Sequence, residues 1–485
     1  MPCLNHDDHG MTRRDVLRGV GLGAVSALAA GCAPRAMARG DTSALPQQAS
    51  ARKPNIIFIL ADDLGYGDVG CYGQKKVRTP NIDALAADGM RFTQVYSGST
   101  VCAPSRCALM TGLHTGHCQV RGNSLVPLRP EDRTVAEVLK AAGYTTAIIG
   151  KWGLGEPGTT GIPTRKGFDY WFGYLNQRHA HNSWPTYLWR NEEKVPLKNV
   201  VPQEDAVGAG VASERREFSG DLFTKEALQF VERSKDKPFF LYLTYTIPHA
   251  NNEAGKQGME VPSDEPYSAE DWPQVEKNFA AAVTRMDADI GRLVALIRKL
   301  GLSENTVIFF TSDNGPHREG GHDPTFFQSG GPLRGIKRNL YEGGIRVPMI
   351  VRWPGRVKAG SVSDQAWAFW DFLPTAAEIA GARPPAGIDG LSMLPAIEGR
   401  PQTGHEYLYW EFHEGGFAQA VRMGDWKGVR RGLGGATELY NLRDDLGETK
   451  NVAADHPDVV KRIEEIFRTA HVDSPEFPVK KAPAK

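Results

Sequence analysis

Four short apolar runs, each leading into a reactive polar residue, constrain this 485-residue chain most strongly. The runs cover residues 55–60, 144–149, 239–245 and 306–310 and are rich in β-branched and aromatic residues. Such runs form buried strands of a parallel sheet when amphipathic helices lie between them. The sequence therefore predicts an α/β fold with a doubly wound, mostly parallel central sheet.

Amphipathic stretches between these runs predict the helices. One helix is expected to begin with Thr79 as its cap and Pro80 at its first position, since the fixed φ of proline suits that position. Further helices are expected over residues 133–142, 221–234 and 279–300, the last ended by Gly301. Their apolar faces would cover the sheet.

The pattern changes after about Pro384. Residues 407–412, 418–422, 426–430 and 437–440 are typical of short strands separated by glycine and charged turns, and residues 456–471 of a helix. We therefore expect a catalytic domain over residues 54–385, an antiparallel β subdomain with one helix over 386–475, and a tail over 476–485.

The N-terminal region predicts export. A pair of arginines, Arg13 and Arg14, precedes a small-residue apolar stretch over residues 19–30, which resembles a twin-arginine signal and is too short for a membrane anchor. Residues 28–32 resemble a lipoprotein cleavage box ending at Cys32, and residues 36–38 offer an ordinary cleavage site instead. We expect a leader over residues 1–38, a linker over 39–53, and a periplasmic or outward-facing, membrane-anchored protein.

Overall charge and cysteine content limit the partners. Lys and Arg total 57, as do Asp and Glu, so the zero net charge favours neither nucleic acid nor an anionic membrane as partner. Contact with a membrane is expected only through a lipid anchor at Cys32. The six cysteines are too few and too irregularly spaced for a disulfide scaffold in so long a chain.

Oxygen-bearing side chains follow the first and fourth apolar runs. Asp62 and Asp63 come after the first, and Asp313 and Asn314 after the fourth. Ligands bind outside the carboxyl ends of the strands in an open α/β sheet. Clustered carboxylates raise one another's pKa unless a cation neutralises them, and an oxygen-only set favours Ca²⁺, or secondarily Mg²⁺, over zinc. Each pair taken alone is also a common turn sequence.

Other reactive residues are expected at the same crevice. Lys151 and His249 follow the second and third runs. Cys102 opens the run Cys-Ala-Pro-Ser-Arg, in which Pro104 is suited to begin a helix whose N–H groups would face a bound anion. Arg106 adds a planar fork that suits an oxyanion. A lone buried core cysteine is the alternative interpretation.

These motifs resemble the type I, formylglycine-dependent sulfatases of the alkaline-phosphatase-like superfamily. The Cys-x-Pro-Ser-Arg signature is complete, and the resemblance spans residues 53–470. It includes residues 55–63, 150–152, 248–249, 312–315, 333–337 and 341–348. The resemblance implies an alkaline-phosphatase-like fold and a sulfuric ester hydrolase.

The resemblance also implies residue roles. A formylglycine-generating maturation enzyme would oxidise Cys102, and Arg106 would steady the hydrated aldehyde. Lys151 and Lys337 match the cations that bind sulfate, and His249 matches the acid that protonates the leaving alkoxide. The calcium ligands are matched by Asp62, Asp63, Asp313 and Asn314.

One position departs from the family pattern. Many members carry histidine two residues after the first lysine, where this chain has Gly153. The base for the second half-reaction is thus open among the remaining candidate histidines, which are also candidate substrate contacts: His179, His181, His317 and His322.

Residues 178–189 are expected to form a long loop rich in histidine and aromatic residues. Aromatic faces stack on sugar rings, so sugar recognition is the favoured interpretation, with plain loop packing as the alternative. Zinc binding by His179 and His181 lacks a third ligand nearby in sequence.

We therefore expect hydrolysis of a sulfate monoester of a sulfated carbohydrate outside the cytoplasm, with a galactose- or N-acetylgalactosamine-type sulfate preferred. Phosphonate monoester or phosphodiester hydrolysis on the same scaffold is an alternative. A non-catalytic lipoprotein that binds sulfated glycans is an alternative from another class. The expected partners are the saccharide, the maturation enzyme and the twin-arginine export machinery.

Overall fold

The computed structural model describes residues 52–479. The predicted twin-arginine signal, the cleavage sites, Cys32 and nearly all of the linker lie outside these residues, as does the end of the predicted tail. Within the described part of the chain, no helix is long and apolar enough to cross a bilayer.

The large domain is built on an 11-stranded sheet, which confirms the predicted fold class. The strand order is β10-β2-β9-β8-β1-β7-β3-β4-β5-β6, with β11 also pairing with β2. The strands of this sheet are β1 (Asn55–Ala61), β2 (Met90–Tyr96), β3 (Thr145–Lys151), β4 (Tyr170–Tyr174), β5 (Tyr187–Arg190), β6 (Glu193–Pro196), β7 (Phe239–Thr244), β8 (Thr306–Ser312), β9 (Arg346–Arg352), β10 (Ser361–Ser363) and β11 (Trp367–Ala368).

The centre of the sheet is parallel. Strand β1 pairs in parallel with β7 and β8, and β3 pairs in parallel with β7 and β4, whereas β9 and β5 run antiparallel to their neighbours. All four apolar runs seen in the sequence are among these central strands, β1, β3, β7 and β8. Their carboxyl ends consequently lie at one edge.

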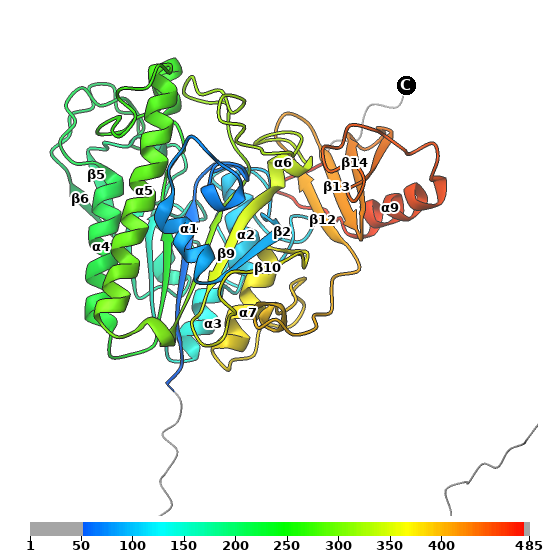
Figure 1. Cartoon of the computed structure of the whole chain (residues 1–485), viewed down its shortest axis with the longest axis horizontal. Helices are drawn as coiled ribbons and strands as arrows, with labels where there is room; N and C mark the ends of the chain where they lie inside the picture. Colours follow the sequence, from blue (N-terminus) through cyan, green and yellow to red (C-terminus); the bar gives the residue numbers. More distant parts are fainter. Residues whose placement is uncertain (1–51, 480–485) are drawn as a thin grey trace, which may run out of the picture. The chain divides into compact units, whose positions relative to one another are not determined.

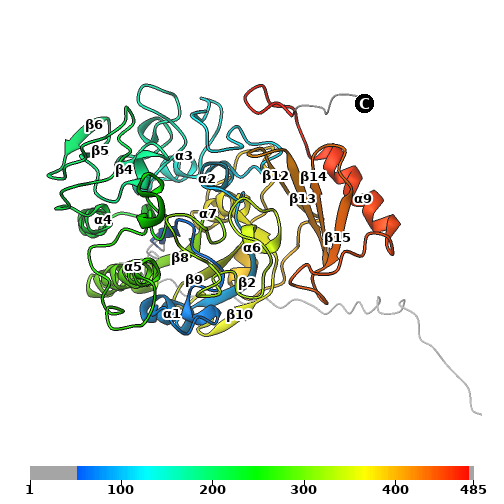
Figure 2. The same ribbon diagram turned by 90° about the horizontal axis from the view of Figure 1, so that it is seen from above.

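Helices cover both faces of the sheet. The helices are α1 (Pro80–Ala87), α2 (Cys102–Thr111), α3 (Val135–Ala141), α4 (Ser219–Ser234), α5 (Gln274–Lys299), α6 (Glu342–Ile345), α7 (Phe372–Ile379), α8 (Leu394–Ile397) and α9 (Pro457–Thr469). Helices α1, α4 and α5 pack with one face of the sheet, and α2, α3 and α7 with the other (Figure 2).

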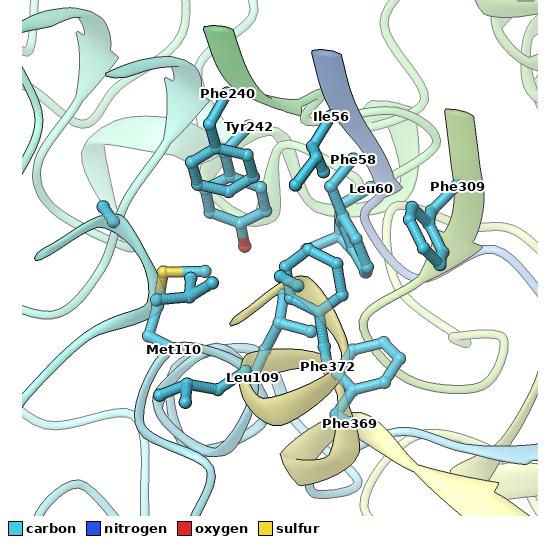
Figure 3. Packing of buried hydrophobic residues seen from close by; sticks show 14 of the residues in the cluster. Ile56, Phe58, Leu60, Leu109, Met110, Phe240, Tyr242, Phe309, Phe369 and Phe372 are labelled. Atoms are coloured by element: carbon cyan, nitrogen blue, oxygen red, sulfur yellow. The ribbon is translucent and has the colours of Figure 1, made fainter. Parts of the chain in front are cut away.

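Alternation along β1 places successive side chains in two different cores. Ile56, Phe58 and Leu60 lie in the core with α2 and α7, while Ile57 and Ile59 lie in the core with α4 and α5. Figure 3 shows the first core, where Phe58 and Phe372 have ring centroids 4.4 Å apart. Dense packing of this kind holds the strand ends in a fixed geometry.

A second sheet follows the first along the chain. It contains β12 (Leu408–Phe412), β13 (Ala418–Met423), β14 (Trp426–Arg431) and β15 (Thr437–Asn441) in antiparallel order, and α9 packs against it (Figure 1). The predicted small antiparallel sheet with a terminal helix is therefore confirmed.

Three local predictions need correction. The predicted start of α1 is confirmed, with Thr79 at the cap position and Pro80 first, but the Thr79 side chain makes no capping bond and instead accepts from the Gly70 N–H at 2.8 Å. Helix α2 begins at Cys102 rather than Pro104. Val101, which has an extended backbone, is its N-cap residue, and the helical backbone starts with the next residue. The expected long loop over residues 178–189 contains a 3₁₀ turn (His179–His181) and most of β5, which pairs with β4 and β6.

Candidate active site

Strand register brings the predicted site residues together. Ala61 pairs with Ser312, so the next residues, Asp62 and Asp313, continue side by side. Thr244 pairs with both Leu60 and Gly150, which places Lys151 at the same edge. Parallel strands that end in register thus form one polar crevice from segments far apart in the chain.

Four oxygen-bearing side chains lie at the centre of this crevice and are fully buried: Asp62, Asp63, Asp313 and Asn314. The Asp63 N–H donates to Asp313 Oδ1 at 3.1 Å, and Asn314 Nδ2 donates to Asp63 Oδ1 at 2.8 Å. Asn314 Oδ1 is buried and accepts no hydrogen bond from any of residues 52–479. Because an orphaned buried acceptor is costly, this oxygen and its carboxylate neighbours suit a hard cation.

The protonation of the carboxylates also indicates a cation site. Burial and the neighbouring charge of Asp62 raise the pKa of Asp313 to about 7. Burial also opposes ionisation of Asp62, but the charges of Lys151 and Arg106 outweigh it and hold the Asp62 pKa well below its usual range. The predicted mutual elevation of carboxylate pKa values therefore applies to Asp313 and not to Asp62.

Asp63 has an unusual backbone. Its φ is 68°, a left-handed conformation that costs most non-glycine residues about 1 kcal/mol. Residues strained in this way cluster at functional sites, where the surroundings hold them in place. The conformation turns the chain so that Asp62 and Asp63 both face the crevice.

Cys102 opens α2 and faces the same cluster. Its Sγ donates to Asp62 Oδ1 at 3.3 Å, and ligand atoms of Asp62, Asp63, Cys102 and His249 all lie within 4.8 Å of one another. Burial and then the Asp62 charge raise the pKa of the thiol well above its ordinary value. An unmodified Cys102 would thus be a protonated thiol and a weak nucleophile.

Arg106 lies one turn further along α2 and is completely buried. Its Nε and one terminal nitrogen donate to Asp313 Oδ2 at 3.1 and 2.7 Å. Its other terminal nitrogen donates to the Lys151 carbonyl at 2.7 Å and to Thr244 Oγ1. Arg106 therefore ties α2 to the ends of β3, β7 and β8.

Two buried lysines flank the carboxylates. Lys151 Nζ lies 2.7 Å from Asp62 Oδ2, and Lys337 Nζ lies 2.7 Å from Asp63 Oδ2. Lys337 Nζ also donates to Glu319 Oε2 at 3.0 Å and to His249 Nε2 at 3.2 Å. Their positive charge is available to an anion that enters the crevice.

His249 is oriented by its neighbours. Its Nδ1 donates to the Ala250 carbonyl at 2.7 Å, which leaves Nε2 facing Lys337 and, at 3.5 Å, Asp63. Burial and then the Lys337 charge lower its pKa well below the ordinary value. The ring is neutral until a bound anion offsets the lysine charge.

The other candidate histidines divide into two groups. The rings of His181 and His317 stack on His249 at 5.0 and 6.3 Å, so both border the site. His322 instead pairs with Glu276 at 2.7 Å and stacks on Phe279. His179 is buried against Tyr174 and Tyr187.

Two of the aromatic side chains that follow take part in packing, and the predicted sugar recognition stays a prediction. Trp184 is buried against Phe218, and Tyr187 covers His179. Among the described residues, neither His179 nor His181 belongs to a group arranged to hold a metal ion.

The position of the Gln177 side chain explains why residue 153 is a glycine. Gly153 has a φ of 82°, and a Cβ at this position would come within 1.9 Å of Gln177 Nε2. The Gln177 amide therefore fills the space that a larger residue at 153 would need. Both polar atoms of this amide are buried without a hydrogen-bond partner.

Two contributors were missed in the sequence. Thr244 is the last residue of β7 and binds Arg106, a position that the strand-end argument could have indicated. Glu319 bridges Lys337 and Arg338, at 3.0 and 2.6 Å. Nothing in its local sequence distinguishes Glu319 from an ordinary surface glutamate.

The site combines a cysteine, buried carboxylates, two lysines and an oriented imidazole. This combination defines the class of the protein: a hydrolytic enzyme for an anionic ester. The family model described as Sulfatase matches residues 54–382, and the one described as N-sulphoglucosamine sulphohydrolase, C-terminal, matches residues 336–471. The chain belongs to the sulfatase family of alkaline-phosphatase-like fold and is a sulfuric ester hydrolase.

Named relatives agree with this assignment. An N-acetylgalactosamine-6-O-sulfatase of Bacteroides thetaiotaomicron is 31% identical over 498 residues, covering 87% of this chain and 93% of that protein. The N-acetylgalactosamine-6-sulfatase of Mus musculus is 32% identical over 407 residues, covering 77% and 71%. The crystal structure of Ps i-CgsB in complex with k-i-k-neocarrahexaose matches with a TM-score of 0.73 and 29% identity, covering 86% and 93%.

Proposed function

We propose that this enzyme hydrolyses a sulfate monoester of a sulfated carbohydrate, with galactose or N-acetylgalactosamine sulfate as the preferred sugar. The observation that carries the proposal is the approach of Cys102, Asp62, Asp63 and His249 within 4.8 Å, between two lysines. The names of the bacterial and mouse relatives support the choice of sugar.

Conversion of Cys102 to formylglycine is part of the proposal. The raised thiol pKa supports it, because an unmodified thiol at this position would be a poor nucleophile. The hydrated aldehyde supplies one hydroxyl to attack sulfur and a second hydroxyl whose deprotonation expels sulfate. Arg106, anchored on Asp313, holds the start of α2 in place for this chemistry.

A calcium ion is proposed as the cofactor, held by Asp62, Asp63, Asp313 and Asn314. The unpaired Asn314 Oδ1 and the raised Asp313 pKa support a cation here, and the oxygen-only set favours a hard ion, Ca²⁺ or secondarily Mg²⁺, over zinc. When bound, the ion supplies positive charge that orients the sulfate and lowers the pKa of the attacking hydroxyl.

The lysines and His249 act on the substrate. Lys151 and Lys337 exchange part of their contact with Asp62 and Asp63 for the sulfate oxygens and offset the charge that develops on them. The negative charge of the sulfate counters Lys337, so the His249 pKa rises towards its ordinary range when substrate binds. His249 Nε2 then carries the proton that the leaving sugar oxygen accepts.

The proposal also covers the histidines near His249 and the cellular route. His181 and His317 are the proposed bases for the second half-reaction, because their rings adjoin His249.

We propose that the twin-arginine machinery exports the folded enzyme after maturation, with or without a lipid on Cys32. The boundary between the catalytic domain (54–385) and the C-terminal subdomain (386–475) stays a proposal as well.

Turnover of 4-nitrophenyl sulfate and of a phenyl phosphonate by the purified enzyme tests the reaction. We expect the sulfate ester to be strongly preferred, whereas a preference for the phosphonate would overturn the proposal. Binding of sulfated glycans without turnover of any ester would instead establish the binding-protein alternative.

Mass spectrometry tests the nucleophile. The peptide that contains residues 101–106 should be lighter than its cysteine form by the difference between a thiol and an aldehyde. An unmodified thiol in fully active enzyme would refute the formylglycine mechanism.

A further inference from the structure

A cavity of about 300 Å³ lies between the large domain and the C-terminal sheet. Its walls are residues 338–341, which lead into α6, together with the β12–β13 turn and the end of β14. Both ribbon views show α6 beside this sheet (Figures 1 and 2). The volume lies at the lower end of the range of small-molecule sites.

One wall of this interdomain cavity is connected by hydrogen bonds to the segment that carries Cys102. Glu414, in the β12–β13 turn, accepts from the Asn123 N–H at 2.6 Å. Asn123 Oδ1 in turn accepts from the N–H of Ala103, the residue after Cys102, at 2.9 Å. Two hydrogen bonds therefore separate the cavity from the start of α2.

The opposite wall contacts Lys337, the proposed sulfate ligand, through an ion-pair bridge. Glu319 binds Lys337 with one carboxylate oxygen, at 3.0 Å, and Arg338 with the other, at 2.6 Å. The Arg338 N–H also donates to the Thr100 carbonyl at 3.0 Å, close to Cys102. A sugar held at the catalytic centre thus has this cavity beside it.

One arginine of the cavity is available to bind an anion, while the lining carboxylate, Glu414, has its Oε1 occupied by a backbone N–H. Arg431, at the end of β14, is exposed and lies over the Tyr341 ring at 5.6 Å. It forms no salt bridge with any carboxylate of residues 52–479, whereas Arg338 has Glu319 as its partner. A guanidinium is well suited to bidentate binding of sulfate or carboxylate.

A second cavity next to the site has the opposite character. It measures about 520 Å³ and is lined by Arg178, Asp205 and Glu253, the last of which pairs with His181. There the arginine is already neutralised by both carboxylates, at 2.8 and 3.6 Å. Arg178 is consequently less available to a bound anion than Arg431 is.

We infer that the interdomain cavity binds the anionic substituent, sulfate or carboxylate, of the sugar unit next to the one that is desulfated, with Arg431 as its main ligand. The inference rests on the proposed hydrolysis of carbohydrate sulfates and adds a substrate class: oligosaccharides with an acidic neighbouring unit. The aromatic side chain of Tyr341 and the glycine turn at residues 415–416 leave room for the ring that carries this substituent.

Steady-state kinetics on four substrates test the inference. They are a sulfated monosaccharide and oligosaccharides that carry the same sulfated unit beside a neutral, a sulfated or a uronate unit. For Arg431→Ala we expect KM to rise roughly tenfold more for an oligosaccharide with an anionic neighbour than for the monosaccharide. An effect of this size corresponds to the loss of one charge-assisted hydrogen bond. Arg431→Lys should recover part of this loss, and added salt should reduce the difference between wild type and variant.

Arg443→Ala is the matched control, because Arg443 is also an exposed arginine of the subdomain but does not line the cavity. It should leave the substrate preference of the wild type in place. The sulfated and uronate arms identify which anion the cavity selects. Equal effects of Arg431→Ala on all four substrates, or no effect on any, would overturn the inference, while absence of turnover by the wild type would refute the proposed function itself.

Discussion

Two buried carboxylate sites in this protein differ in how their charge is satisfied. Glu411, on β12, is fully buried and accepts hydrogen bonds from Arg121, Tyr409, His413 and His471 at 2.8 to 2.9 Å. Burial opposes its ionisation, but the bonds from His413 and His471 and the Arg121 charge hold its pKa at about 2. Folding alone completes this site.

The catalytic carboxylates are not completed by folding. Burial and the Asp62 charge raise the pKa of Asp313 to about 7, and Asn314 Oδ1 has no donor. Lys151 and Lys337 neutralise Asp62 and Asp63, but the same lysines are the proposed ligands of the sulfate. The comparison teaches that a buried carboxylate with a full set of donors fastens two parts of a fold, while a cluster that keeps an unpaired buried oxygen and a carboxyl group with a raised pKa is suited to a cation.

Replacement of Cys102 should have the largest effect on activity. Cys102→Ala removes the group that attacks sulfur, and we expect sulfatase activity to fall roughly 10⁴-fold or more. Cys71→Ala, at a partly exposed cysteine outside the site, should retain activity. Turnover of 4-nitrophenyl sulfate by both variants checks this, and an active Cys102→Ala enzyme would contradict the assigned nucleophile.

Replacement of Glu411 should affect stability rather than chemistry. Glu411→Gln leaves the buried Arg121 without its counter-charge, and we expect the free energy of unfolding to fall by about 3 kcal/mol. The variant should keep its activity per folded molecule. Denaturant unfolding followed alongside turnover measures both effects, and a loss of turnover in folded Glu411→Gln would remove the distinction between the two sites.

Calcium should stabilise only through the catalytic cluster. At 100-fold excess over its dissociation constant, the ion should raise the free energy of unfolding by about 2.7 kcal/mol. Asp63→Asn should lose most of this gain, while Glu411→Gln should keep it. Thermal unfolding with and without a chelator checks the prediction, and equal calcium responses in both variants would place the ion elsewhere.

Acidification should produce the smallest effect. The Glu411 pKa is lowered in the folded state from 4.5 to about 2, so its stabilisation is present above pH 4.5 and is lost as the pH falls towards 2. Between pH 6 and pH 4 the contribution of Glu411 should fall by roughly 1 kcal/mol. The stability difference between wild type and Glu411→Gln should narrow accordingly, and a constant difference would show that Glu411 does not titrate as described.

The sequence was sufficient to predict the central strands of the sheet and most of the residues that meet in the crevice. Buried parallel strands leave a local signal, because both faces of such a strand are covered, so the strand contains a short continuous apolar run that ends where the polar site begins. Asp62, Lys151 and Asp313 were thus placed at one edge without knowledge of the strand order, and the register of β1 with β8 confirmed it. The local pattern predicted the start of α1 at Pro80 correctly but not the start of α2, which lies at Cys102 rather than Pro104.

Only the tertiary structure decided which distant side chains complete each site. Glu319 reaches Lys337, the His181 ring lies on His249, and Gln177 fills the space beside Gly153, although none of these pairs has a sequence signature. The donors to Glu411 come likewise from separate segments of the chain. The physical reason is that strand alternation and strand ends are set by neighbours in sequence, whereas the pKa values, the orphaned oxygen and the cavity depend on how separate elements pack.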